Sequence, residues 1–140
     1  MILDRDAIAR LVPHGGAMCL LHEVLEADAG SIRARAVGHR DAAHPLREGG
    51  VLPALCGLEY AAQAMAVHGA ICEGGTKRPG MLAALRDVEL AVERLDDIAG
   101  DLTVDAHCLM SEGGRFLYRF QVRAGSRELL SGRATVVTGK

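Results

Sequence analysis

One stretch of the chain is long, nearly uncharged and rich in alanine. Residues 49–72 carry a single formal charge, that of Glu59, and alanine occupies six positions between residues 54 and 72. Alanine has the highest helix propensity, and a helix that is apolar on all sides is buried on most of them. The sequence therefore predicts a central helix over residues 54–72 that other elements surround.

A transmembrane span is the alternative interpretation of this stretch. Four residues interrupt its apolar character, namely Pro53, Glu59, Gln63 and His68, and no cluster of basic residues flanks it. A spanning helix needs about 20 predominantly apolar residues, and basic residues usually gather beside one end. We therefore predict that protein surrounds the helix and that the chain has no membrane span.

The last third of the chain has the pattern of an antiparallel sheet. Apolar and polar residues alternate over residues 102–110, 116–124 and 130–136, and the pairs Gly113-Gly114 and Gly125-Ser126 separate these segments. Such alternation is typical of strands with one buried face, and short turns join antiparallel neighbours. We predict a three-stranded meander.

The remaining segments predict shorter elements. Residues 4–12 have the pattern of a short helix, residues 17–25 form an apolar run typical of a buried strand, and residues 31–37 alternate as a half-buried strand does. Residues 81–95 keep a helical spacing of apolar positions, so propensity alone favours a helix there. Together the segments predict one α+β domain, residues 1–140, with at least five mostly antiparallel strands around one long helix.

Charge and motif content exclude several classes of function. The chain has 16 Lys and Arg residues against 18 Asp and Glu residues, a net charge of -2, whereas proteins that bind nucleic acids need a basic surface. The sequence contains no phosphate-binding loop, no GxSxG serine motif and no HExxH zinc motif. We therefore expect neither a nucleic-acid partner nor a kinase, serine hydrolase or metalloprotease.

The cysteines and the first residues of the chain predict its compartment. The four cysteines, at positions 19, 56, 72 and 108, form no CxxC pair, so neither a metal site nor a disulfide framework is expected. Ile2 and Leu3 are followed at once by charged residues, which excludes the apolar core of a signal peptide. We expect free thiols and a cytoplasmic location.

Glu59 and Gln63 are the polar residues of most chemical interest. A carboxyl group inside an apolar helix must be neutral or paired, and a carboxyl held neutral by desolvation can donate a proton. Gln63 follows by four residues on the same helical face, where it can orient Glu59 or a substrate. The alternatives are that Glu59 lies on an exposed stripe of the helix or that both residues are structural.

The start of the helix and the loop before it hold further candidates. Unpaired N–H groups of a first helical turn can hold a carbonyl oxygen or an oxyanion. Of the six histidines, His39 and His44 lie in this loop, where catalytic residues often concentrate. The charged neighbour Arg40 indicates a solvated corner at His39. His107 is expected on the polar face of a strand, and His68 lies half a turn out of phase with Glu59.

Two segments resemble one enzyme family. Leu11, Val12, Pro13 and His14, followed by the run from residue 18 to Val24, look like the opening of the hotdog-fold β-hydroxyacyl-acyl-carrier-protein dehydratases. Residues 51–63 resemble their helix motif, in which Pro53 is followed by the catalytic acid at Glu59 and by Gln63. The variant GLEYAAQA is similar to a divergent branch of predicted 3-hydroxyacyl-carrier-protein dehydratases that is found with aryl-polyene pathways.

The resemblance implies a hotdog fold, in which five to six antiparallel strands wrap around one long central helix. Residues 81–90 would then be a strand, against their helical spacing. The resemblance also implies a dimer with a continuous sheet and two sites at the interface, formed with a second copy or with a related hotdog subunit.

The resemblance also implies a reaction and its residues. His44 is the best match to the catalytic histidine, with His39 as competitor, and would remove the proton alpha to the carbonyl of a 3-hydroxyacyl thioester. Glu59 of the partner subunit would protonate the departing hydroxyl, and N–H groups near Cys56 and Gly57 would polarise the carbonyl. No metal or redox cofactor is implied, because an acyl carrier protein or coenzyme A presents the substrate on phosphopantetheine.

Two other functions stay open at this stage. A hotdog thioesterase would use a helix carboxylate such as Glu59 to activate water, and it would release a free thiol. A non-catalytic subunit would instead shape the site of a heterodimeric dehydratase, and it would show turnover only with its partner.

Overall fold

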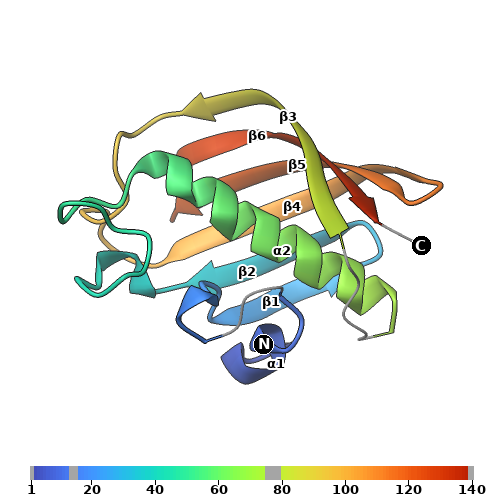
Figure 1. The fold of residues 1–140 in the computed structure, drawn as a ribbon, viewed down its shortest axis with the longest axis horizontal. Coiled ribbons are helices and arrows are strands. Elements are labelled where there is room, and N and C mark those ends of the chain that lie inside the picture. The colour runs from blue at the N-terminus through green and yellow to red at the C-terminus, as the bar shows by residue number, and fades with distance from the viewer. Residues whose placement is uncertain (1, 13–15, 75–79, 139–140) are drawn as a thin grey trace.

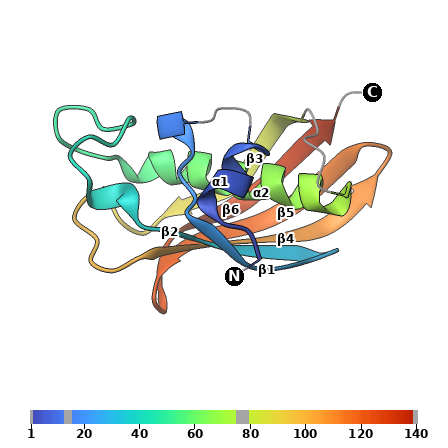
Figure 2. The same ribbon diagram turned by 90° about the horizontal axis from the view of Figure 1, so that it is seen from below.

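Over the residues that the structure describes, the chain forms one six-stranded antiparallel sheet that wraps around a single long helix. The computed structural model describes residues 2–12, 16–74 and 80–138. Figure 1 shows the helix lying across one face of the sheet, and Figure 2 shows the sheet curving beneath it. The sheet order is β1-β2-β4-β5-β6-β3, which confirms the predicted α+β class. The elements are α1 (Arg5–Ala9), η1 (Gly16–Met18), β1 (Glu23–Asp28), β2 (Ser31–Ala36), η2 (Gly38–Arg40), η3 (Ala54–Cys56), α2 (Gly57–Cys72), β3 (Gly80–Leu90), β4 (Leu102–Glu112), β5 (Arg115–Ala124) and β6 (Arg127–Thr138).

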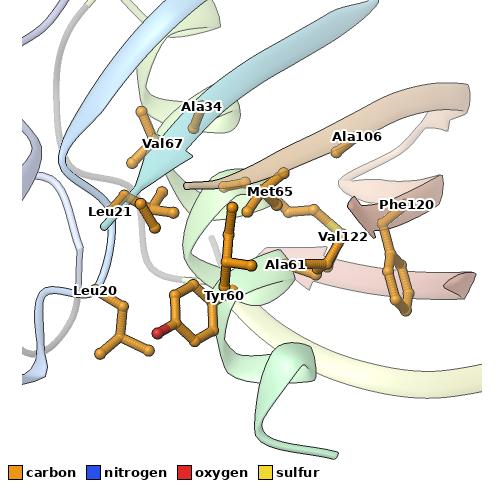
Figure 3. Packing of buried hydrophobic residues seen from close by; sticks show 14 of the residues in the cluster. Leu20, Leu21, Ala34, Tyr60, Ala61, Met65, Val67, Ala106, Phe120 and Val122 are labelled. Carbon is orange, nitrogen blue, oxygen red and sulfur yellow. The ribbon is translucent and has the colours of Figure 1, made fainter. Parts of the chain in front are cut away.

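The central helix is the predicted alanine-rich stretch. A 3-10 turn, η3, leads directly into α2, so that helical structure runs from Ala54 to Cys72. Its sheet-facing side is fully buried, and Figure 3 shows Tyr60, Ala61 and Met65 in the same cluster as strand residues of β4 and β5. Burial of this apolar side against the sheet is the main source of stability for the arrangement. No helix among the described residues meets the length and hydropathy that crossing a membrane requires.

The three predicted strands of the meander are confirmed as β4, β5 and β6, and residues 31–37 are confirmed as β2. The inward residues of β2, Ile32, Ala34 and Ala36, are buried as the alternation predicts. β2 pairs with β4 rather than with β3, so the meander continues into the first half of the chain.

The helical spacing of residues 81–95 was misleading, and the strand implied by the resemblance is correct. β3 pairs with β6, and Leu82 and Leu85 lie opposite Val136 and Ala134. Three residues of β3 therefore span two residues of β6, because a β-bulge inserts an extra residue. Each extra residue lengthens the interval between apolar positions from the two residues of a regular strand to three. That interval is typical of a helix, and for this reason the segment has a helical spacing.

The strand predicted over residues 17–25 is also wrong in its first half. Regular pairing begins only at Glu23. Before that point the guanidinium of Arg5 donates to the carbonyl of Cys19 at 2.8 Å, and Gln63 bonds to the backbone of Met18 and Leu20. The backbone polar groups of this segment are thus satisfied by side chains instead of a neighbouring strand.

A buried carboxylate links three strands on the outer face of the sheet. Asp105 of β4 is 6% exposed and accepts from Arg33 of β2 at 2.7 Å and from Arg123 of β5 at 2.8 Å. Burial raises the pKa of Asp105, but the bonds from the two guanidinium groups outweigh it and hold the pKa below its ordinary value of 3.8. A carboxyl with a depressed pKa stabilises the folded state above that value and loses its contribution as the pH falls.

We expect Asp105→Asn to lower the free energy of unfolding at neutral pH by about 2 kcal/mol, because both arginines lose their charged partner. The estimate lies below the loss for a fully buried ion pair, since both arginines are partly exposed. Urea denaturation between pH 7 and pH 3 measures the difference. It should begin to shrink below about pH 4, where the carboxyl of the unfolded chain takes up a proton, and should shrink further as the pH falls through the lower pKa of the folded carboxyl. A difference that stays constant would contradict this account.

Two glycines of α2 allow a matched test of packing. A Cβ atom at Gly57 would overlap the side chain of Leu130, whereas a Cβ at Gly69 would meet nothing within 4 Å. We expect Gly57→Ala to destabilise the protein by about 1–3 kcal/mol through overpacking. Gly69→Ala should instead stabilise it by up to about 1 kcal/mol through helix propensity. Thermal denaturation measures both, and shifts of the same sign would contradict the packing described.

Candidate active site

A large cavity lies between one side of α2 and the strands β3, β5 and β6. Its volume is about 1130 Å³, and its lining on the helix runs from Glu59 through Ala66 and Gly69 to Cys72. Apolar side chains of the strands, among them Phe116, form the opposite wall. A mostly apolar cavity with a few polar groups is typical of a small-molecule site.

Glu59 lies on the half-exposed stripe of the helix, at the point where the cavity begins. The amide of Gln63 donates to its Oε2 at 3.2 Å. Gln63 is itself 2% exposed and fixed at both ends, since it donates to the carbonyl of Met18 at 2.6 Å and accepts from the N–H of Leu20 at 2.9 Å. The predicted pair is therefore brought together, and Gln63 holds the carboxylate of Glu59 in a defined orientation.

His44 lies on the other side of the helix start and is not in the lining of this cavity. The N–H of Leu46 donates to its Nδ1 at 3.1 Å, so that nitrogen has no proton. The neutral ring then carries its proton on Nε2, which donates to the hydroxyl of Tyr60 at 3.0 Å. Burial, followed by the charge of Arg47, lowers the pKa of His44. The imidazole is thus neutral at pH 7, but both of its nitrogens are engaged within the chain.

His39, the competing histidine, is deeply buried rather than at a solvated corner. It is 1% exposed, and its Nε2 is 2.8 Å from the carbonyl of Ile98. Its Nδ1 has no partner among the described residues. The charged neighbour Arg40 suggested a solvated loop, but the 3-10 turn η2 directs Arg40 outward and His39 inward. The side chain of His39 therefore connects its own loop to the loop that contains Ile98.

Cys56 and Gly57 lie at the junction of η3 and α2, as the helix motif predicts. The N–H of Cys56 donates to the carbonyl of Pro53 at 3.0 Å, and the N–H of Gly57 donates to Ala54 and Leu55. Both amides thus have acceptors inside their own turn, and Gly57 is required for the close approach of Leu130. The substrate-binding role of these two residues stays a prediction. Pro13 and His14 of the opening motif lie outside the described residues.

A second polar pair, missed by the sequence analysis, lies at the far end of the cavity. His68 accepts from the hydroxyl of Tyr118 at 2.7 Å, and its Nε2 donates to the carbonyl of Asp28 at 2.9 Å. Both side chains are 2% exposed, and both line the cavity. The two residues are 50 positions apart in the chain, so only the fold brings them together. Among the described residues, no cluster of His, Cys, Asp and Glu is arranged for a metal ion.

Comparison with family models agrees with this geometry. Residues 6–140 match the model of the ApeP dehydratase, described as ApeP-like. The chain belongs to the ApeP-like dehydratase family. Comparison with curated protein sequences gives no match.

Solved structures of similar fold support the hotdog assignment. The dehydratase heterocomplex ApeI:P from Xenorhabdus doucetiae superposes with a TM-score of 0.82 at 21% identity, covering 95% of this chain and 91% of that chain. AziG from S. sahachiroi gives a TM-score of 0.68 at 14% identity over 92% and 98% of the two chains. A thioesterase from Haemophilus influenzae gives 0.62 at 13% identity over 84% and 78%. The ApeP-like family member thus has the predicted hotdog fold.

Proposed function

We propose that this ApeP-like protein is a hydro-lyase that converts a 3-hydroxyacyl thioester into a trans-2-enoyl thioester. The observation that carries the proposal is the position of Glu59, a carboxyl held by Gln63 at the start of an apolar cavity of about 1130 Å³. An acyl chain fits such a cavity, and a fixed carboxyl beside it can serve as a general acid.

The reaction is an elimination in which the atoms balance. A base removes the proton on the carbon next to the thioester carbonyl, and the electron pair forms the double bond to the next carbon. The 3-hydroxyl leaves with the proton of Glu59, as water. Acid and base are regenerated when the proton returns, so the reaction needs no metal or redox cofactor. The substrate would be carried on phosphopantetheine, from an acyl carrier protein or coenzyme A.

His44 is the proposed base. Its lowered pKa keeps the ring neutral at pH 7, as a base requires. Since His44 is not in the lining of the cavity of its own chain, the proposal needs a second subunit that brings a histidine to Glu59. Acceptance of a substrate proton also requires His44 to give up one of its bonds to Leu46 or Tyr60.

We expect the second subunit to pair at β3. This edge strand exposes apolar side chains, including Met81 at 67% and Leu90 at 46%, and an exposed apolar edge is prone to pair with another strand. Sedimentation should give a dimer at micromolar concentration, and a stable 14.8 kDa monomer would contradict the prediction. The partner is either a second copy or a related hotdog subunit, as in the similar ApeI:P heterocomplex.

A second candidate function is favoured by the geometry of His44. Because both nitrogens of His44 are engaged, the chain would supply only Glu59 and the cavity, while a related subunit supplied the base. Purified protein with a 3-hydroxyacyl-pantetheine thioester distinguishes the two functions by mass spectrometry. Loss of water by the protein alone supports the first. Loss of water only after a hotdog partner is added supports the second, and no dehydration in either case would contradict both.

A further inference from the structure

A short segment between β3 and β4 is bonded to the chain just before α2. In this segment the N–H of Leu95 donates to the carbonyl of Leu52 at 2.8 Å, and the carbonyl of Glu93 accepts from the N–H of Ala54 at 3.0 Å. Ala54 is also the first residue of the turn that leads into α2. The start of the helical structure is therefore fixed by a part of the chain that lies far from it in the sequence.

Asp96 adds a side-chain bond to this attachment. Its Oδ1 accepts from the N–H of Leu52 at 2.8 Å, and the guanidinium of Arg94 donates to its Oδ2 at 2.6 Å. The bonds from Arg94, followed by the bond from Leu52, hold the pKa of Asp96 below its ordinary value of 3.8. The side chain of Asp96 is only 7% exposed, and Leu52 is fully buried. Without Asp96 the N–H of Leu52 would therefore be a buried donor without an acceptor, which folded proteins rarely tolerate.

Backbone hydrogen bonds continue from Leu52 to His44. Glu48 and Val51 exchange two bonds, at 2.8 Å and 3.0 Å, between their N–H and carbonyl groups. The N–H of Arg47 then donates to the carbonyl of His44 at 3.1 Å. Two consecutive turns thus join Leu52 to His44, so a displacement of Leu52 also displaces the imidazole.

We infer that Asp96 is a positioning residue, which fixes Leu52 and thereby sets the place of the His44 imidazole at the start of α2. This inference rests on the proposed function, because it takes His44 as the base. The bond from His39 to the carbonyl of Ile98 attaches the same loop at its other end. That attachment matters less, since a buried carbonyl without a partner is tolerated more readily than a buried N–H.

The first test compares the activity of three variants in the active assembly. Asp96→Leu removes the acceptor of Leu52, and we expect it to lower kcat/KM by about 10²-fold, the effect of a displacement of about 1 Å in an active site. Asp96→Asn keeps an oxygen that can accept from Leu52, so it should recover most of the rate. Asp105→Asn is the control for lost stability, because it removes a buried carboxylate on the outer face of the sheet and should keep the rate per folded molecule. Equal rates in Asp96→Leu and Asp105→Asn would overturn the inference.

The second test needs no turnover, because NMR follows the titration of His44 directly. Burial lowers the pKa of His44, and the charged or titratable groups that act on it are Arg47, Asp41 and His39. If Asp96 positions the loop, Asp96→Leu should admit water to the imidazole and raise its pKa toward the ordinary value of 6.5. Loss of the negative charge alone would lower the pKa instead, and Asp96→Asn should leave it unchanged.

This titration separates failure of the inference from failure of the proposed function. A raised pKa of His44 in Asp96→Leu supports the positioning role even if the wild type dehydrates no substrate. An unchanged pKa would overturn that role, whatever the activity. If Asp96→Leu does not fold, Arg94→Gln replaces it, because the carboxylate then loses the guanidinium that holds it while the substituted side chain is 43% exposed. We expect a smaller rise of the pKa in Arg94→Gln, and no rise would overturn the inference.

Discussion

Glu59→Gln is expected to remove dehydration while leaving the fold intact. The glutamine side chain has a similar volume, and its carbonyl oxygen can still accept from Gln63, which now donates to Glu59 at 3.2 Å. The amide has no proton to give to a departing hydroxyl, so the rate should fall by about 10²–10⁴-fold, the usual contribution of a general acid. Steady-state kinetics measures the rate, and thermal denaturation should show an unchanged midpoint.

Gln63→Leu provides the comparison for this variant. It removes the bond to Glu59 together with the two bonds to Met18 and Leu20, so it should lower stability as well as rate. Glu59→Gln should lower rate alone. Full activity in Glu59→Gln would remove this carboxyl from the mechanism and leave the cavity without its proposed acid.

His44→Ala is expected to lower the rate by about 10²-fold or more, on the scale of a lost general base. The variant also removes the hydrogen bond to Tyr60, so a loss of stability alone would not identify the base. Tyr60→Phe is the control, because it removes the same bond and keeps the imidazole. If His44 is the base, the rate should fall in His44→Ala and not in Tyr60→Phe. The free energy of unfolding should fall by a similar amount in both variants.

The outcome for His39 completes this test. His39→Ala should stay within a few-fold of the wild-type rate per folded molecule, although it removes the bond to Ile98 and should lower the melting temperature. If His39→Ala loses most of its rate while His44→Ala stays active, His39 rather than His44 is the base. Full activity in both variants would point to a base from a related subunit, or to a thioesterase that uses Glu59 alone.

Much of the fold follows from short-range patterns in the sequence. The alanine-rich helix was predictable because its one charge and its high propensity occur within a single segment. The meander was predictable because its strands alternate regularly and are joined by turns that contain glycine. In both cases the residues that determine the structure are close together in the chain.

The errors arose where distant residues determine the local structure. The bulges of β3 are set by its register with β6, in which Leu82 and Leu85 meet Val136 and Ala134. The segment before Glu23 is held by Gln63, more than 40 residues away. Neither interaction leaves a periodic signal in the segment that it shapes.

The candidate site was predictable to a similar extent. The spacing of four residues correctly placed Gln63 beside Glu59, because both lie on one helical face. The environment of His44 was not predictable, since its bond to Tyr60 depends on how the loop folds back on the helix. The pair of His68 and Tyr118 likewise required the strand order.

A crystal structure of the assembled protein with an unreactive 3-hydroxydodecanoyl amide would test the central claim most directly. We expect the carboxyl of Glu59 to lie about 2.6–3.2 Å from the 3-hydroxyl of the ligand, and a histidine nitrogen to face the carbon between that hydroxyl-bearing carbon and the carbonyl. A ligand whose carbonyl carbon, rather than its 3-hydroxyl, lies beside Glu59 with a water between them would contradict the account and indicate hydrolysis of the thioester.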